Sequence, residues 1–68
     1  MTDKTYKLIE IVGTSSESFA RAADNAVTKA SESLHNLDWF EVTGFRGRID
    51  GGKLAEYQVT LKVGFRLD

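Results

Sequence analysis

The sequence predicts an α+β fold with the element order β-α-β-β. Three observations predict it. A β-branched and aromatic run comes first, one stretch with helical apolar periodicity follows, and two further β-type runs flank Asp50-Gly51-Gly52-Lys53, a typical hairpin signal. With 68 residues and no sign of a linker or repeat, we expect a single domain over residues 1–68.

The small size of the chain predicts self-association. A domain of this length buries only about 60% of the surface that its unfolded chain exposes, and disulfides, a metal or oligomerisation usually compensate. The chain has no cysteine, and its one histidine, His35, cannot form a zinc site without other ligands. We therefore expect a homo-oligomer without a metal site.

The charge balance narrows the class of partner. The net charge is −1 and the pI about 5.7, whereas nucleic-acid binders normally carry a basic excess. No apolar run resembles a signal peptide or approaches the roughly 18 residues of a membrane span. We expect a cytoplasmic protein that binds a small molecule or another protein, with neither a nucleic-acid nor a membrane partner.

The first strand is expected over Thr5 to Val12, followed by a turn over Gly13 to Glu17 that leads into the helix. Thr14 and Glu17 have the spacing of a capping box, and Ser15 is an equally good N-cap. We interpret this stretch as a cap and not as a phosphate site, because it lacks the repeated glycine and the lysine of a P-loop.

The helix is expected from about Ser16 to about Leu34. Its apolar stripe is mostly alanine, so another element can approach it closely; the stripe consists of Phe19, Ala22, Ala23, Ala26, Val27, Ala30 and Leu34. His35 and Asn36 are expected to end the helix, with His35 near the last carbonyls, where a cation suits the helix dipole.

The second strand, expected over residues 39–49, has a fault in its alternation. Phe40 and Val42 are apolar at even positions, but Phe45 and Ile49 are apolar at odd ones. Both pairs face the helix only if one residue is inserted between them, so we predict a β-bulge at Thr43-Gly44.

The third strand, expected over residues 54–67, alternates cleanly and sets the register. A three-residue loop over residues 51–53 would place Ile49 opposite Ala55. The other predicted pairs are Arg46–Gln58, Val42–Leu61, Phe40–Val63, Glu41–Lys62 and Trp39–Gly64. The face turned away from the helix then carries Trp39, Glu41, Arg46, Gln58, Lys62 and Arg66. A tryptophan on such a face is either an oligomer contact or a stacking platform, and both interpretations stay open.

Several motifs in this order resemble the dodecin family across essentially the whole chain. They are Tyr6-Lys7, Glu10-Ile11-Val12-Gly13-Thr14-Ser15, Asp38-Trp39-Phe40-Glu41-Val42, Arg46-Gly47 and Tyr57-Gln58-Val59-Thr60-Leu61-Lys62-Val63-Gly64-Phe65-Arg66-Leu67. The resemblance implies a three-stranded antiparallel sheet wrapped around one helix. It also implies a hollow homododecamer that stores or sequesters FMN or riboflavin and quenches its photochemistry, without acting as an enzyme.

The resemblance also assigns roles to single residues. Trp39 matches the tryptophan that stacks on a flavin pair between subunits, Gln58 the glutamine at the polar edge of the isoalloxazine, and Arg46 an arginine associated with the FMN phosphate. Phosphate or coenzyme A contacts are implied for Lys4, Tyr6 and Arg66, and Asp38 is a further cofactor-binding candidate. Gly44 departs from the family, where a larger and often acidic residue is expected, so a cation held there is in doubt.

The predicted register separates two of these candidates. Trp39 lies opposite residue 64, six residues along the strand from Gln58, which is roughly 20 Å in an extended strand. We therefore expect one flavin to meet Trp39 and Gln58 from different chains. The alternative is an oligomer that binds mainly coenzyme A, or one whose Trp39 face is only a protein contact. We do not expect an enzyme, because Glu41, the one imaginable base, is predicted to pair with Lys62.

Overall fold

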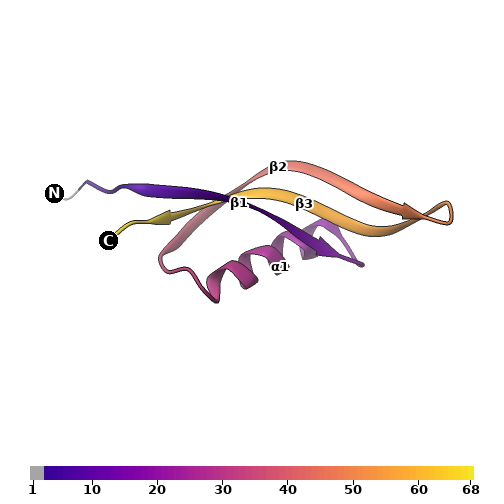
Figure 1. Ribbon diagram of the computed structural model, residues 1–68, viewed down its shortest axis with the longest axis horizontal. Helices are drawn as coiled ribbons and strands as arrows, with labels where there is room; N and C mark the ends of the chain where they lie inside the picture. The colour runs from indigo at the N-terminus through magenta and orange to yellow at the C-terminus, as the bar shows by residue number, and fades with distance from the viewer. Residues whose placement is uncertain (1–2) are drawn as a thin grey trace.

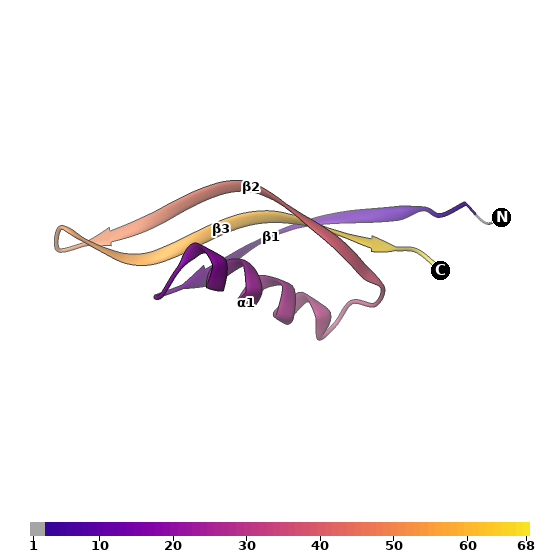
Figure 2. The ribbon, with the colours of Figure 1, turned by 180° about the vertical axis from the view of Figure 1, so that it is seen from behind.

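The protein is described by a computed structural model that covers residues 3–68. Strand β1 spans Tyr6–Ser15, helix α1 Phe19–Ser31, strand β2 Leu37–Asp50 and strand β3 Lys53–Arg66. The sheet is antiparallel with the order β1-β3-β2, and α1 lies against one of its faces (Figures 1 and 2). The predicted α+β class and β-α-β-β order are confirmed.

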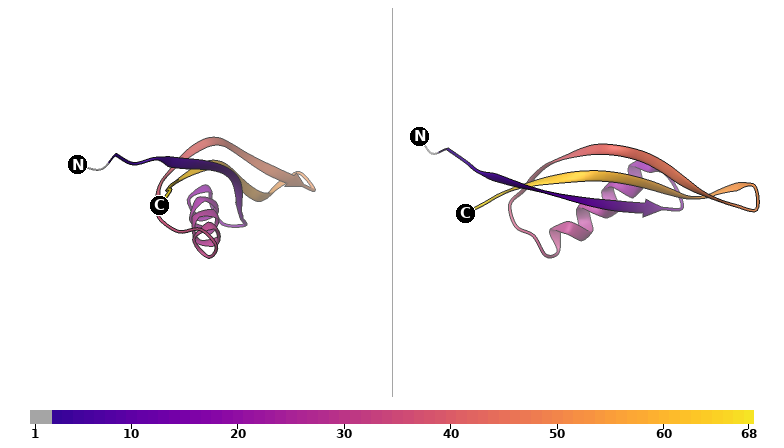
Figure 3. Two further views of the ribbon diagram at one scale, coloured as in Figure 1. Left: turned by 60° about the vertical axis from the view of Figure 1, so that its left-hand side comes forward. Right: turned by 45° about the horizontal axis from the view of Figure 1, so that its top comes forward.

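The sheet arches over the helix and extends beyond it. Figure 3 shows the three strands curving above α1 when the molecule is viewed toward one end. The principal extents are 55 × 20 × 14 Å, and the β2–β3 hairpin forms the far end of the long axis. The helix packs mainly on β1 and β3. The tip of the β2–β3 hairpin extends beyond the helix, so it has no helix beneath it.

Small residues allow the helix to lie close to the sheet. Ala22, Ala26 and Ala30 are buried, as their helical spacing predicts. At Gly13, in β1, a Cβ atom would lie 2.7 Å from the Cβ of Ala26, so only glycine allows this approach. The core is completed by Val59, Leu61 and Val63 of β3, the strand with the cleanest alternation.

The ends of the helix differ from the expected ones. The pairing of β1 with β3 continues to Ser15, so the predicted turn at Gly13 is wrong and the helix begins later. Ser18 is the N-cap, and its hydroxyl accepts from the backbone N–H of Arg21 at 2.9 Å. The Ser15 hydroxyl instead accepts from the backbone N–H of Glu17 within the connection.

The helix also ends earlier than expected, at Ser31, with Glu32 as its C-cap. Asn36 has the positive φ of 63° that its residue type tolerates, but it lies in the connection to β2 and not at the helix end. The capping role expected for His35 is therefore wrong, because it lies four positions beyond Ser31, the last residue of α1.

The predicted register is confirmed over most of β2 and β3. Trp39 pairs with Gly64, Phe40 with Val63, Glu41 with Lys62, Val42 with Leu61 and Arg46 with Gln58, and the predicted bulge lies between Val42 and Gly44. The confirmed bulge keeps the apolar side chains on either side of it on the helix face.

The expected three-residue hairpin loop is wrong. Asp50 pairs with Lys53 around Gly51 and Gly52, whose positive φ angles of 59° and 77° suit a two-residue type I′ turn. Ile49 consequently pairs with Leu54 and not with Ala55, and a second register shift follows between Arg48 and Ile49. A third shift, between Leu37 and Trp39, was not expected from the sequence.

Candidate functional site

The indole of Trp39 lies flat over Gly64 on the outer face of the sheet, which we define as the face turned away from α1. A Cβ atom on Gly64 would come within 2.8 Å of three indole atoms, so the glycine makes room for the ring against β3. Trp39 remains 43% exposed, so part of the indole surface is open to solvent. The backbone of Gly64 thus covers one side of the indole, and the rest of the ring is partly exposed.

Tyr6 and Asp38 flank this indole. The Tyr6 ring centroid lies 4.7 Å from that of Trp39 with a 56° tilt, and the Tyr6 hydroxyl donates to Asp38 Oδ2 at 2.9 Å. Since Tyr6 belongs to β1 and Asp38 to β2, this hydrogen bond links the two edge strands of the sheet across the central strand β3. The hydrogen bond to the Asp38 carboxylate raises the pKa of the Tyr6 phenol, and nearby Arg66 partly opposes the shift.

Arg46 and Gln58 form a second group nearer the hairpin. Their predicted pairing places the side chains together, and Arg46 Nε donates to Gln58 Oε1 at 2.6 Å. The Gln58 amide nitrogen in turn donates to Glu56 Oε1 at 2.8 Å, and Arg48 Nε lies 3.9 Å from the same oxygen.

The parts played by Glu56 and Arg48 were not predicted from the sequence. The side-chain alternation of β2 and of β3 contains the signal that could have predicted both residues. Glu56 and Gln58 are two residues apart on β3, and Arg46 and Arg48 lie directly opposite on β2. The four side chains therefore form a square of two cross-strand pairs.

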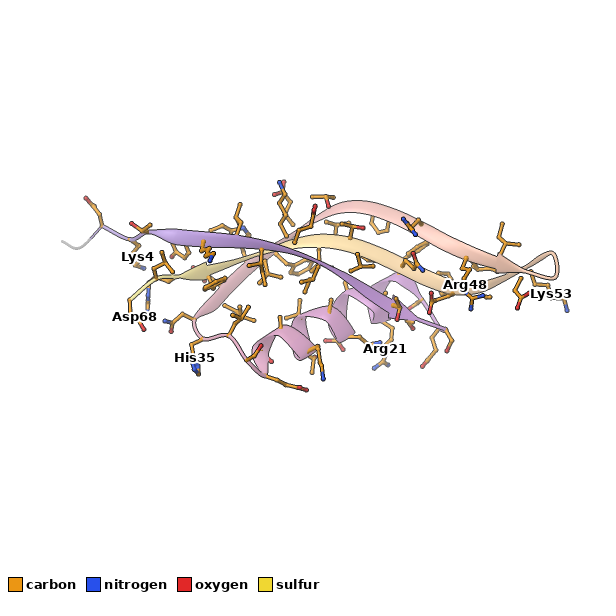
Figure 4. The ribbon with its side chains drawn as sticks, in the orientation of Figure 1. Lys4, Arg21, His35, Arg48, Lys53 and Asp68 are labelled. Atoms are coloured by element: carbon orange, nitrogen blue, oxygen red, sulfur yellow. The ribbon has the colours of Figure 1, made fainter. Side chains whose placement is uncertain are left out.

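Lys4 and Arg66 are brought to the other end of the sheet. Both line a shallow depression together with Asp3, Thr5, Leu67 and Asp68. The backbone N–H of Leu67 donates to the carbonyl of Thr5 at 2.9 Å and holds this end together. Figure 4 shows Lys4 and Asp68 at this end, Arg48 and Lys53 at the hairpin end, and His35 on the connection after α1.

The candidates therefore form two groups on one face. Arg66 pairs with Tyr6 in the sheet, so Tyr6, Asp38, Trp39 and Arg66 lie near one another, with Lys4 beyond them. Arg46 and Gln58 lie at the hairpin end, six residues along β3 from Gly64, or roughly 20 Å. Across residues 3–68, no three His, Cys, Asp or Glu side chains gather as a metal site, and no helix could cross a membrane.

Comparisons with known proteins identify the family of the chain. The family model described as Dodecin matches residues 5–68. A dodecin of Thermus thermophilus is 49% identical over 65 residues, covering 96% of this chain and 94% of the relative. The solved structure of dodecin from Streptomyces coelicolor is 53% identical, with a TM-score of 0.95 and coverage of 100% of this chain and 97% of that one.

A more distant relative is the calcium dodecin of Mycobacterium tuberculosis. It is 32% identical over 62 residues, covering 91% of this chain and 87% of the relative. Its solved structure, described as having a novel calcium-binding site, matches with a TM-score of 0.83 at 34% identity, over 94% of this chain and 91% of that one. Fold and sequence agree, and the chain belongs to the dodecin family, whose members are small ligand-binding proteins that assemble into multimers.

Proposed function

We propose that this protein binds and stores FMN or riboflavin in the cytoplasm and quenches its photochemistry. Flavins would bind as stacked pairs between Trp39 side chains of neighbouring subunits in a hollow homododecamer. The observation that carries the proposal is the Trp39 indole, which lies against Gly64 and remains 43% exposed on the outer face. A flat, partly exposed aromatic ring suits offset stacking on a planar heterocycle.

The separation of Trp39 from Gln58 supports a site shared between subunits. In one chain the two side chains are roughly 20 Å apart along the sheet, further than an isoalloxazine ring extends. A flavin stacked on Trp39 of one subunit would therefore meet the Gln58 amide of another. On this proposal an isolated subunit binds flavin weakly.

The basic residues supply a place for the phosphate of FMN. Arg46 is next to Gln58, and a guanidinium can bind a phosphate through paired hydrogen bonds. Lys4, Tyr6 and Arg66 are the other candidates, near the indole end, and the same groups would suit the phosphates of coenzyme A. We propose binding without turnover, because Glu41, the acid considered as a base, lies opposite Lys62 in the sheet.

A second candidate function is supported by the apolar side chains that the subunit exposes. Leu8, Val12, Phe40 and Phe45 are all about half exposed or more. In this alternative Trp39 belongs to such a contact surface between subunits, and coenzyme A is the main ligand, bound through the arginines and Lys4.

A fluorescence titration with riboflavin and FMN, combined with a mass measurement of the assembly, separates the two functions. We expect the wild-type protein to quench flavin emission as a dodecamer. Trp39→Ala should keep that mass and lose about 2 kcal/mol of binding per stacked ring, or roughly thirtyfold in Kd.

The matched control is Phe40→Leu, which alters the neighbouring aromatic residue on the opposite face and should leave the flavin affinity unchanged. Quenching that survives in Trp39→Ala would contradict the stacking role. A wild-type protein that ignores flavins, together with a Trp39→Ala protein that dissociates, would favour the second candidate.

A further inference from the structure

The side-chain amide of Gln58 is held between one group that can only donate and one that can only accept. Arg46 Nε donates to Gln58 Oε1 at 2.6 Å, and Gln58 Nε2 donates to Glu56 Oε1 at 2.8 Å. A guanidinium has no acceptor, and an ionised carboxylate has no donor. Rotating the amide by 180° would place N–H against guanidinium and oxygen against carboxylate, so both hydrogen bonds would be lost.

Glu56 is itself held in position. It pairs with Arg48 across the two strands, and Arg48 Nε lies 3.9 Å from the oxygen that accepts from Gln58. The Glu56 side chain is only 31% exposed, against 57% for that of Arg48. This carboxylate is thus a partly buried acceptor on strand β3, and its cross-strand partner is a cation.

The two anchors leave a defined pair of free groups on the amide. Gln58 retains one N–H on Nε2 and one lone pair on Oε1, and both are available to a ligand. A donor beside an acceptor in one plane complements a ring edge with an adjacent carbonyl and N–H. The pyrimidine edge of an isoalloxazine, in which the N3–H lies between two carbonyls, has this arrangement.

We propose that Glu56 is a positioning residue that fixes the orientation of the Gln58 amide and thereby makes the site selective for an imide edge with a free N–H. The inference rests on the proposed function, since it takes a flavin as the ligand. It adds that recognition at the polar edge depends on a carboxylate that does not itself touch the ring.

The test compares riboflavin with N3-methylriboflavin, which lacks the N3–H and has no phosphate to engage arginines. We expect the wild-type assembly to bind riboflavin at least about tenfold more tightly than the methylated form. Glu56→Ala should weaken riboflavin binding by about tenfold and leave binding of the methylated form unchanged. Glu56→Gln retains a carbonyl acceptor and should recover most of the loss.

A Gln58→Leu background separates positioning from a general structural effect. If Glu56 acts through Gln58, adding Glu56→Ala to Gln58→Leu costs no further riboflavin affinity. Glu32→Ala is the matched control, because it removes a carboxylate that is bound to Lys29 on the exposed side of the helix. It should change neither ligand's affinity.

Three results would overturn the inference. One is a Glu56→Ala protein that loses affinity for riboflavin and for N3-methylriboflavin equally. Another is a further loss of riboflavin affinity when Glu56→Ala is added to Gln58→Leu. The third is a wild-type protein that binds both flavins equally, which needs no variant and so holds even if Glu56→Ala fails to assemble. A wild-type protein that binds neither flavin would instead reject the proposed function.

Discussion

The two ends of the outer face are built in different ways. The aromatic end, made of Trp39, Gly64, Tyr6 and Asp38, has an indole resting on a backbone and one hydrogen bond across the sheet. The polar end, made of Arg46, Gln58, Glu56 and Arg48, is a chain of charged and amide groups. The first offers a flat apolar surface, and the second offers directional donors and acceptors.

The support beneath the two ends differs as well. Under the aromatic end Val63 is buried, whereas the hairpin end extends past α1 and leaves Ile49 and Leu54 73% and 52% exposed. Apolar side chains gathered on one overhanging surface are typical of a protein contact. The hairpin is thus the region that most needs a neighbouring subunit to cover its apolar side chains. It also carries Arg46 and Gln58, the polar groups that are absent around the indole.

The largest effect should come from filling the space under the indole. Gly64→Ala places a methyl group where the ring now lies, so Trp39 must tilt away and offset stacking is lost. We expect a loss of about 2 kcal/mol, or roughly thirtyfold in flavin Kd, with the assembly intact. Flavin titration and native mass spectrometry would measure both.

Gly44→Ala is the matched control on the same face. A Cβ there would have only the Thr60 Cβ, at 3.9 Å, as a near neighbour, so flavin binding should be unchanged. An equal loss of flavin affinity in the two variants would mean that the contact between Gly64 and the Trp39 indole has no special role.

A smaller and more selective effect is expected at the polar end. Arg46→Met removes a guanidinium that can bind the FMN phosphate, so FMN should lose about 1.5 kcal/mol, or roughly tenfold in Kd, relative to riboflavin. Isothermal titration with the two ligands gives this ratio directly. In Arg48→Met, a change of the same kind two residues along β2, the FMN-to-riboflavin ratio should stay at its wild-type value, and an equal change there would contradict a specific role for Arg46.

The sequence predicted the parts of the fold that alternation controls. The parity change between Val42 and Phe45 located a bulge, and the apolar side chains of β3 located the helix face, because a strand with one buried face tolerates no register slip. The Trp39–Gly64 and Arg46–Gln58 pairs follow from that register. Alternation alone is therefore enough to group the site residues on the outer face.

The helix start and the hairpin loop could not be predicted in the same way, because more than one local backbone conformation fits the sequence at each. Ser15 and Ser18 are both good N-caps, and only the continued pairing of β1 with β3 decides for Ser18. At the hairpin, both a two-residue and a three-residue loop fit the glycines, and the choice displaced Ile49 by one partner. Alternation places Glu56 beside Gln58 on the outer face, but its hydrogen bond to the Gln58 amide depends on how that amide is turned, which alternation does not show.

The smallest effect concerns the hydrogen bond at the aromatic end. Because the Asp38 carboxylate raises the Tyr6 pKa, the phenol stays protonated above its ordinary value of about 10. The stability that this bond contributes is complete below that value and is lost as the pH rises through the raised pKa. The difference in tyrosinate absorbance between the wild-type protein and Tyr6→Phe should therefore show an ionisation above pH 10.

Asp38→Asn tests the cause of the shift. An amide oxygen still accepts the hydrogen bond but carries no charge, so the Tyr6 ionisation should move back toward its ordinary range. Near-ultraviolet circular dichroism of Trp39 should change over the same pH interval, because the phenol that contacts the indole then loses its tie to β2. A Tyr6 that ionises at its ordinary pKa in the wild-type protein would show that the bond between the outer strands is not maintained in solution, and that the indole is held by Gly64 alone.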